Sequence, residues 1–142
     1  MVGLNFDKLL VDKKKPVKAP IKINSNLAIK DLKEDKMDVP KGQKMLRFDF
    51  EFTLDYQPDT ADVVVAGHVL YSEEDKKAKV MLDDWKKSKK FDPEVVRNVL
   101  NAALLRANIK ALLITQEVGL PPHLQFPSVA PNKGKGAKSY TG

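Results

Sequence analysis

A strict alternation of apolar and polar residues over residues 46–56 constrains the fold more than any other feature of the sequence. Side chains of a β-strand point to opposite faces with a period of two, whereas a helix would distribute these residues around its whole circumference. We therefore predict a long strand with one apolar face. Burying each large apolar side chain is worth about 1.5–3 kcal/mol relative to exposure, so another part of the chain must cover this face. The apolar positions are Leu46, Phe48, Phe50, Phe52, Leu54 and Tyr56.

A long helix is predicted as that cover, from a cap at Asp92 to Val118. Asp92 is a favourable N-cap residue, Pro93 suits the first helical position, and Gly119 can adopt the left-handed conformation that ends a helix. The helix is about 39 Å long at 1.5 Å per residue, and the strand is about 37 Å long at 3.4 Å per residue. The helix also has apolar residues beyond one stripe, which predicts a second partner such as another subunit or a bound chain. These residues are Leu104, Leu105, Ile109, Leu112 and Leu113.

The remaining strands are predicted from β-branched and aromatic runs separated by turn residues. Residues 21–32 predict one or two short strands, and residues 62–71 predict a further strand. A polar connection at 72–77 leads to residues 78–82, predicted as a third strand of an antiparallel meander, and residues 83–91 then link the sheet to the helix. The predicted fold class is α+β, with an antiparallel sheet of about four strands covered on one face by one long helix.

Three segments are expected along the 142-residue chain. Residues 1–20 are predicted to be a flexible basic arm, because three adjacent lysines at 13–15 repel one another and a proline follows them. Residues 21–130 are predicted to form a single domain, large enough for a substantial core. Residues 131–142 are basic and rich in glycine, and they are predicted to be a disordered tail.

The composition constrains the compartment and the redox chemistry through what it lacks. There are no cysteines, which excludes disulfides, thiolate metal ligands and a cysteine nucleophile. The first residues lack the charged and apolar regions of a signal peptide, and no apolar run approaches the roughly 20 residues of a membrane-spanning helix. We therefore expect a cytoplasmic protein.

Neither histidine lies in a pattern typical of a catalytic or metal site. His68 falls in a predicted strand and His123 in a proline-rich segment, and neither has a second histidine at ligand spacing. Asp83 and Asp84 are interpreted as a solvated turn rather than as a magnesium site. We expect no catalytic residue, no metal and no cofactor, and therefore no enzyme.

The net charge of +6 permits contact with nucleic acid. An alternative hypothesis is therefore a small basic RNA- or ribosome-associated protein whose terminal segments contact phosphates. No aromatic residues are interleaved with the basic runs to stack on bases, which favours solvated loops and tails instead. The residues that would contact nucleic acid under this alternative are Lys13, Lys14, Lys15, Lys133 and Lys135.

The segment after the predicted helix resembles a known family. Residues 119–129 read Gly-Leu-Pro-Pro-His-Leu-Gln-Phe-Pro-Ser-Val, which resembles the Gly-Phe-Pro-Pro segment that follows the long helix of SecB-family export chaperones and their small relatives. The order of strands, linker, long helix and proline segment over residues 21–129 is similar as well. The resemblance implies a SecB-like fold that binds unfolded or extended polypeptide in an apolar groove and assembles into homo-oligomers.

The resemblance also implies site residues. Asp49 and Glu51 are expected to belong to an acidic sheet face that contacts a partner protein. The chain departs from the family in its positive net charge and in the basic tail that stands where members have a second helix. The first hypothesis is therefore a non-enzymatic protein that binds polypeptide or acts as an adaptor. The residues expected to contact polypeptide are Leu120, Leu124, Phe126, Leu105 and Leu112.

Overall fold

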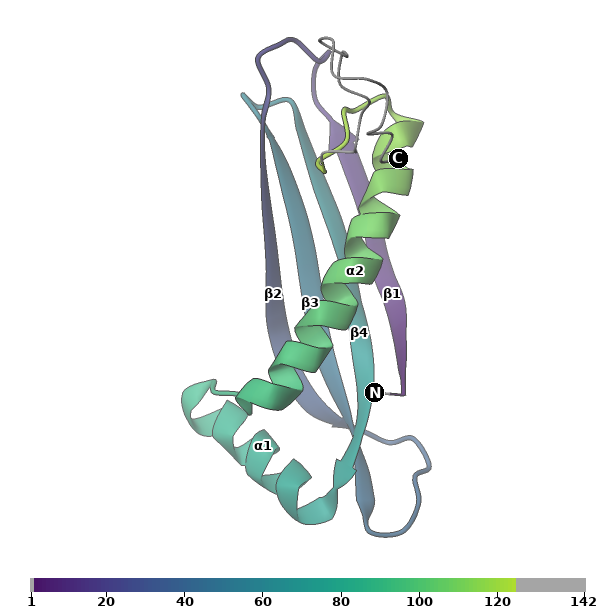
Figure 1. The fold of residues 1–142 in the computed structure, drawn as a ribbon, viewed down its shortest axis with the longest axis vertical. Coiled ribbons are helices and arrows are strands. Elements are labelled where there is room, and N and C mark those ends of the chain that lie inside the picture. Colours follow the sequence, from purple (N-terminus) through teal and green to yellow (C-terminus); the bar gives the residue numbers. More distant parts are fainter. Residues whose placement is uncertain (1, 125–142) are drawn as a thin grey trace, which may run out of the picture.

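The computed structural model describes residues 2–124, in which a long antiparallel sheet is crossed diagonally on one face by a long helix (Figure 1). A shorter helix lies at one end of the sheet, beside the start of the long helix (Figure 1). Neither of these helices is apolar over enough of its length to span a membrane. The elements in chain order are β1 (Gly3–Lys13), β2 (Lys22–Asp35), β3 (Gln43–Gln57), β4 (Ala61–Glu74), α1 (Asp75–Ser88) and α2 (Pro93–Glu117).

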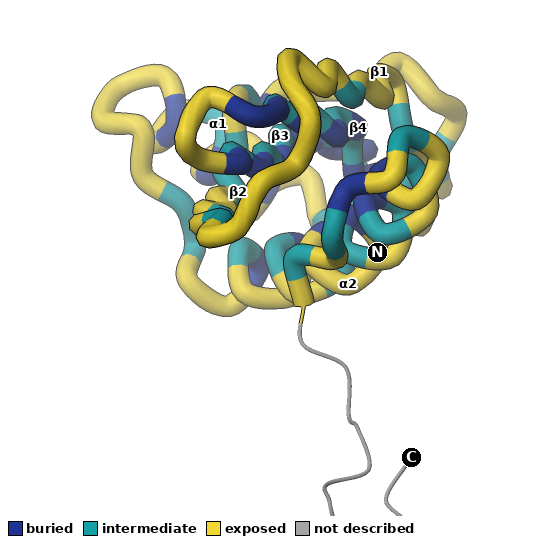
Figure 2. The backbone as a smooth tube through the Cα atoms, turned by 90° about the horizontal axis from the view of Figure 1, so that it is seen from above, coloured by how far each residue is buried: buried dark blue, intermediate teal, exposed yellow. Residues whose placement is uncertain are grey.

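The apolar face of β3 forms the centre of the core, as predicted from its alternation. Its inward side chains, from Leu46 to Tyr56, are each at most 2% exposed. They lie beside inward residues of β4, as Phe52 does beside Val65. Seen along the long axis of the molecule, the buried segments gather in the interior between the sheet and α2 (Figure 2). The predicted α+β class, with four antiparallel strands and a long helix on one face, is confirmed.

α2 begins at the predicted residue and ends within one residue of the prediction. The side chain of Asp92 accepts a hydrogen bond from the backbone N–H of Glu94 at 3.0 Å, which caps the first turn. After the last helical residue Gly119 has a φ of 68°, and the N–H of Leu120 donates to the carbonyl of Thr115 at 3.0 Å. This left-handed glycine satisfies carbonyls of the final turn and redirects the chain toward the sheet.

The face of α2 that meets the sheet consists of small residues at intervals of four. Because most of these side chains are alanine or valine, the backbone of the helix can lie close to the aromatic face of β3. The residues on this face are all buried, and they are Val95, Val99, Ala103, Ala107, Ala111 and Thr115.

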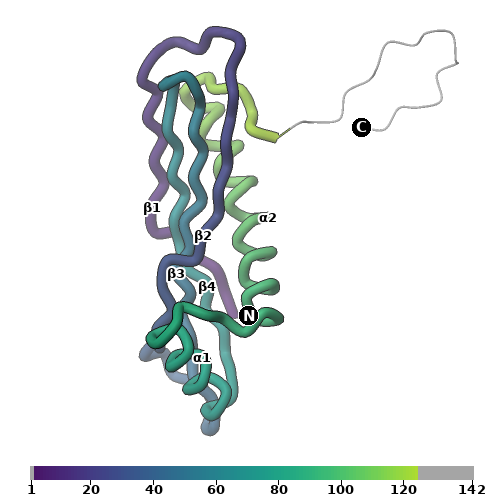
Figure 3. The backbone as a smooth tube through the Cα atoms, turned by 90° about the vertical axis from the view of Figure 1, so that its left-hand side faces the viewer, coloured from purple at the N-terminus to yellow at the C-terminus, as the bar shows by residue number. Residues whose placement is uncertain are grey.

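The four strands are ordered β1-β4-β3-β2, and all neighbours are antiparallel. A loop over residues 36–42 joins β2 to β3 and a tight turn over residues 58–60 joins β3 to β4, while β1 pairs with β4, which is the arrangement of a Greek key. Residues 14–21, here called the crossing connection, therefore pass over the end of the sheet from one edge to the other (Figure 3). The backbone N–H groups of Lys14 and Lys15 hold this connection to the β3–β4 turn by donating to the carbonyl of Thr60 at 2.8 and 3.4 Å.

The prediction of a flexible arm over residues 1–20 is wrong for the part that the structure describes. Residues 3–13 form β1, which pairs with β4 along its length. A bulge between Phe6 and Lys8 shifts the register, so the residues that face inward do not keep a period of two. The interrupted period hid the strand in the sequence. The residues of β1 that lie opposite inward-facing residues of β4 are Leu4, Phe6, Leu9 and Val11.

The limits of the folded unit change accordingly. The unit starts at β1 rather than at residue 21, because β1 supplies one edge of the sheet. The predicted boundary at residue 130 and the predicted tail over 131–142 lie outside the described residues.

The segment predicted as one or two short strands is the single 14-residue strand β2. It also contains a bulge, between Ile29 and Asp31, which explains the three-residue step from Ile29 to Leu32 along its inward face. Both edge strands of the sheet are therefore bulged, a feature that discourages edge-to-edge pairing with other chains.

The prediction of a third meander strand over residues 78–82 is wrong, because these residues belong to α1. The predicted connection at 72–77 and the predicted linker at 83–91 are also largely taken up by β4 and α1. A short apolar run contains too few repeats to distinguish a strand from a helix by its period. The distinction requires the spacing of apolar residues over a longer segment. The buried residues of α1, at a spacing typical of a helix, are Ala78, Met81 and Trp85.

Trp85 attaches α1 to the rest of the molecule. Its indole N–H donates to the carboxylate of Asp31 on β2 at 3.0 Å. Its ring stacks on Phe91, with the ring centroids 4.7 Å apart, and Phe91 in turn lies 6.2 Å from the ring of Phe48. The aromatic residues thus connect α1, the start of α2 and the core at one end of the sheet.

β1 approaches β4 very closely at Gly67. A Cβ atom at this position would overlap the carbonyl oxygen of Asn5 and lie 3.0 Å from the Cα of Phe6. The ring of Phe6 meets that of Phe50 edge-on, with centroids 6.3 Å apart. The missing side chain at Gly67 therefore allows β1 to dock beside the bulge with Phe6 against the core.

Gly67→Ala is expected to lower the free energy of unfolding by about 3 kcal/mol, because the backbone of β1 must move to make room for the methyl group. Gly3→Ala is the matched control, since nothing lies within 4 Å of a Cβ added there. The control should change the stability by less than about 0.5 kcal/mol. Urea denaturation measures both variants, and a Gly67→Ala protein as stable as wild type would contradict this account of how β1 is held.

Candidate functional site

The outer face of α2 carries a row of exposed large apolar side chains, here called the α2 stripe. Leu105 is 63% exposed and Leu113 is 58% exposed, although both belong to a helix that packs on the core. Contiguous exposed apolar surface of this kind marks interaction sites on soluble proteins. The α2 stripe consists of Leu104, Leu105, Ile109 and Leu113.

The outward face of α2 carries larger apolar side chains than the face that meets the sheet. A helix whose only role is to cover a sheet places its largest apolar residues toward the core. Here alanines such as Ala103 and Ala107 face the sheet, and leucines such as Leu105 face outward. The arrangement therefore leaves large apolar side chains available for a second contact.

The chain that follows α2 folds back onto the end of the sheet. The hydroxyl of Tyr56 donates to the backbone carbonyl of Pro121 at 2.6 Å. Leu120 is 3% exposed and packs in the core. This segment therefore anchors the end of α2, and of its two leucines only Leu124 is exposed.

The residues predicted to contact polypeptide differ in their exposure, and only some of them lie on the surface. Ile109 and Leu113 were predicted to be surplus apolar residues for a second partner but were not among the polypeptide-binding residues, although steps of four along the helix from Leu105 lead to both. Leu105 and Leu124 are exposed, Leu112 is half-buried, Leu120 is buried, and Phe126 lies outside the described residues.

His123 belongs to the folded-back segment and lies against α2 and β3. The side-chain N–H of Asn108 donates to the carbonyl of Leu104 at 2.8 Å, which turns the amide oxygen of Asn108 toward His123. Nε2 of His123 lies 2.7 Å from that oxygen and is therefore the protonated ring nitrogen. Nδ1 is buried without a hydrogen-bond partner among the described residues. Burial lowers the pKa of His123, because a second proton would place a charge in this site.

The acidic residues predicted to contact a partner are paired with cations on the outer face of the sheet. Asp49 accepts a hydrogen bond from Nε of Arg47 at 2.8 Å and lies 3.6 Å from the ammonium group of Lys33. Glu51 lies 4.0 Å from the ammonium group of Lys30. This part of the sheet therefore offers less negative charge to a basic partner than the sequence suggested.

Three residues on the same face have the spacing of metal ligands. The ligand atoms of Asp7, Asp49 and His68 lie within 4.8 Å of one another. Nη2 of Arg47 lies 3.4 Å from the Asp7 carboxylate, and Nδ1 of His68 lies 2.8 Å from the same oxygen. Because the guanidinium already pairs with both carboxylates, it supplies the charge that a metal ion would bring. We therefore describe this group as a surface charge network that joins β1, β3 and β4.

Two of the lysines proposed to contact nucleic acid have partners within the protein. The ammonium group of Lys13 donates to the carbonyl of Val118 at 2.9 Å, at the C-terminal end of α2 where a cation is favourable. Lys14 is paired with Asp62 at 2.8 Å and with Asp59 at 3.0 Å, and these hydrogen bonds raise the pKa of Lys14. Lys15 is exposed, and Lys133 and Lys135 lie outside the described residues.

Comparison with known structures finds a similar arrangement of strands and helices. The chain is similar to the Mycobacterium tuberculosis SecB-like chaperone, solved in complex with a ChAD peptide from the HigA1 antitoxin, with a TM-score of 0.49 and 10% sequence identity. The likeness covers 89% of this chain and 88% of that chain. No protein-family model and no curated protein matches the sequence.

Acid is expected to weaken the docking of the segment around His123. Because the pKa of His123 is lowered in the folded protein, the unfolded chain takes up the proton first as the pH falls below about 6.5. The stability is therefore highest above that pH and falls below it, by up to about 1 kcal/mol at pH 5.5 for a partly exposed group.

Urea denaturation at pH 7.5 and pH 5.5 tests this expectation. His123→Gln should lose less stability on acidification than wild type, because its side chain does not titrate. His68→Gln is the control for the other histidine and should retain the loss due to His123. An equal loss in wild type and His123→Gln would contradict the assignment.

Proposed function

We propose that this protein is a non-enzymatic binding protein that holds unfolded or extended polypeptide on the α2 stripe. The observation that carries the proposal is the exposure of four large apolar side chains along one helix, from Leu104 to Leu113. A polypeptide rich in apolar residues would cover this surface without requiring a precise sequence. The likeness to a SecB-like chaperone concerns the fold, and the proposal stands on the stripe itself.

The stripe can supply enough binding energy for such a role. Complete burial of a leucine side chain is worth about 1.5–3 kcal/mol, so covering the exposed half of each stripe residue would contribute roughly 1 kcal/mol. The four contributions together are consistent with weak and reversible binding, because association also costs translational and conformational freedom. Weak binding suits a protein that must release its clients.

Leu124 extends the proposed surface beyond the helix. It is 41% exposed, and it follows His123, which contacts both Asn108 of α2 and the ring of Phe52. The residue before Leu124 thus lies beside Asn108, within the span of the α2 stripe, so a chain lying along α2 would also meet Leu124. Leu120 supports this surface from the core and is not part of it.

Replacement of three of the four stripe residues should strongly weaken client binding. Leu105→Ser, Ile109→Ser and Leu113→Ser combined are expected to weaken binding about 100-fold, since each loses roughly 1 kcal/mol. The readout is light scattering from reduced insulin chains, whose aggregation wild type should slow at molar excess. Val80→Ser is the control, because Val80 is 57% exposed on α1 and lies outside the stripe.

Two outcomes would contradict the proposal. One is a wild-type protein that leaves aggregation unchanged. The other is a triple variant that melts like wild type and still slows aggregation as wild type does. Because the replaced residues are exposed, the variant should keep its fold.

The same helix face is suited to association of two copies of the chain. We infer that two α2 helices pack antiparallel, because the apolar residues from Ala102 to Leu112 recur in steps of three and four, the spacing of helix pairs. If the two-fold axis lies on the outer face at the level of Ala107 along the helix, Leu105 of one copy lies opposite Ile109 of its partner, and Ala102 lies opposite Leu112. The apolar positions in this pairing are Ala102, Leu105, Ile109 and Leu112, of which Leu105 and Ile109 belong to the α2 stripe, and the polar residues Asn98 and Gln116 continue the same spacing.

A second copy and a client would then compete for one surface. Size-exclusion chromatography with light scattering should give a mass above the 15.9 kDa of a monomer, and an excess of apolar peptide should reduce it. Ile109→Glu should yield a monomer, whereas Val80→Glu should not. An Ile109→Glu protein with the wild-type mass would contradict association through α2.

The alternative of RNA binding through the basic segments has weaker support. Lys13 and Lys14 already contact Val118, Asp59 and Asp62. A phosphate backbone would have to displace these contacts at the end of β1. The apolar stripe has no such competing partners among the described residues and therefore favours polypeptide.

A further inference from the structure

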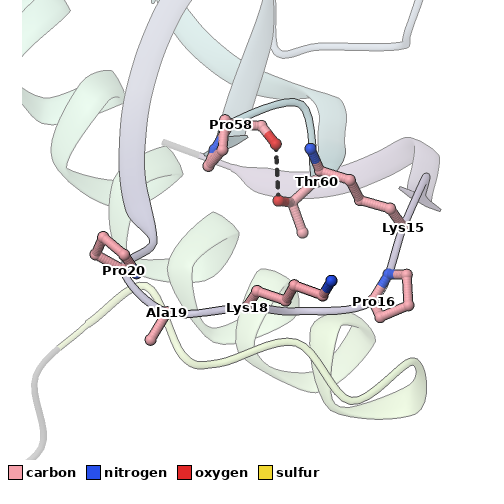
Figure 4. Close-up of a pocket in the computed structure, with 7 residues that line it drawn as sticks. All are labelled: Lys15, Pro16, Lys18, Ala19, Pro20, Pro58 and Thr60. Carbon is pink, nitrogen blue, oxygen red and sulfur yellow. Dashed lines mark hydrogen bonds between the residues drawn. The ribbon is translucent and has the colours of Figure 1, made fainter.

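A cavity of about 360 Å³ lies at the end of the sheet, under the crossing connection (Figure 4). It forms where residues 15–20 pass beside the turn between β3 and β4. Cavities that hold small ligands range over about 300–1,000 Å³, so this one suits a compact molecule. No residue of the α2 stripe lines it, and it is therefore a site separate from the proposed polypeptide surface.

Proline rings provide much of the wall. Pro16 and Pro20 come from the crossing connection, and Pro58 comes from the β3–β4 turn (Figure 4). These rings present carbon and are conformationally fixed. The hydroxyl of Thr60 donates to the carbonyl of Pro58 at 3.0 Å, so its hydrogen is already used within the protein. The wall therefore favours an apolar body in the ligand.

The two segments that form the cavity are held together without a ligand. The N–H groups of Lys14 and Lys15 donate to the carbonyl of Thr60. The ammonium group of Lys14 bridges Asp59 and Asp62, which lie on either side of that residue. The cavity is thus part of the folded structure, and a ligand need not pay to order it.

The charge around the cavity is positive and unbalanced. Lys15 and Lys18 line it, and no acidic residue does. Figure 4 shows the side chains of these lysines on different sides of the space. The nearby carboxylates of Asp59 and Asp62 bind Lys14, the charge of Lys15 acts on Asp59 only from a longer distance, and the described residues form no direct ion pair with Lys15 or Lys18. An anion would supply the missing charge.

We propose that this cavity binds a small carboxylate with an apolar body. The carboxylate lies between the ammonium groups of Lys15 and Lys18, and the apolar part lies against the proline rings. Polyphosphates fit less well, because they are strongly hydrated and the wall is largely carbon. Amines are disfavoured by the two lysines. The carboxylate belongs either to a free acid or to the end of a peptide chain.

Titration of the full-length protein with phenylacetate tests the proposal. The readout is the NMR chemical shifts of the backbone amide groups of Lys15, Lys18 and Thr60. These signals should shift saturably, and the affinity should fall as salt is added. The matched probe 2-phenylethylamine carries the same ring on a cation, and it should leave the signals in place. Equal shifts with both probes, or no shift with phenylacetate, would overturn the proposal.

Substitution of the lysines separates the contribution of their charges to the binding affinity from that of the apolar wall. Lys15→Gln combined with Lys18→Gln should weaken phenylacetate binding about tenfold, the loss of two partly exposed charge contacts. Lys8→Gln combined with Lys22→Gln removes the same charge from exposed positions outside the cavity and should leave the affinity unchanged. Wild-type affinity in the first variant would overturn the proposal.

The source of the carboxylate is distinguished with a short peptide. N-acetyl-Ala-Phe should bind with its free carboxylate, and its C-terminal amide should not. Tighter binding of the peptide acid than of phenylacetate identifies a chain terminus, and the reverse order identifies a free acid. Equal binding of the acid and its amide would overturn the role of the carboxylate. Client binding on the α2 stripe is measured separately, so failure at one site leaves the other test intact.

Discussion

The contact between the aromatic face of β3 and the small-residue face of α2 supports the rest of this structure. The sheet supplies most of the core volume through residues such as Phe50 and Tyr56, and the helix supplies mainly alanine and valine. Protein interiors are close-packed, so a core filled from one side leaves no room for large residues from the other. Leu104, Leu105 and Leu113 of α2 therefore point outward. The exposed stripe is a consequence of how the two layers divide the interior volume.

The long elements of the fold could be predicted because their periods run unbroken and their ends carry capping residues. Residues 46–56 alternate without a fault, and α2 has a favourable residue at each end. β1 and α1 could not be predicted in the same way. A bulge breaks the period of β1, and the few buried residues of α1 give too short a pattern to separate helix from strand. In both cases tertiary contacts, such as the bond from Trp85 to Asp31, determine a structure that local sequence leaves open.

The candidate sites show a similar division. The exposure of Leu105 follows from the excess of apolar residues on α2, which the sequence displays. The burial of Leu120 depends on how the chain turns back after Gly119, and the neutralisation of Asp49 depends on Arg47 beside it in space. The cavity under the crossing connection was the feature least accessible to prediction. Its prolines and lysines suggest a flexible arm in the sequence, and only the pairing of β1 with the sheet brings them to the β3–β4 turn.

The topology also has a consequence for the order in which the molecule is built. β2, β3 and β4 are joined by short connections and can pair as each leaves the ribosome, but Gly3 of β1 pairs with Leu70 at the far end of β4. At roughly 5–20 residues per second, β1 is synthesised seconds before its partner exists. During that interval β4 has not covered the inner edge of β3, and the amphipathic β1 segment is free in solution. The first strand made is therefore the last to join the sheet, and the helix that covers the sheet is made after it has closed.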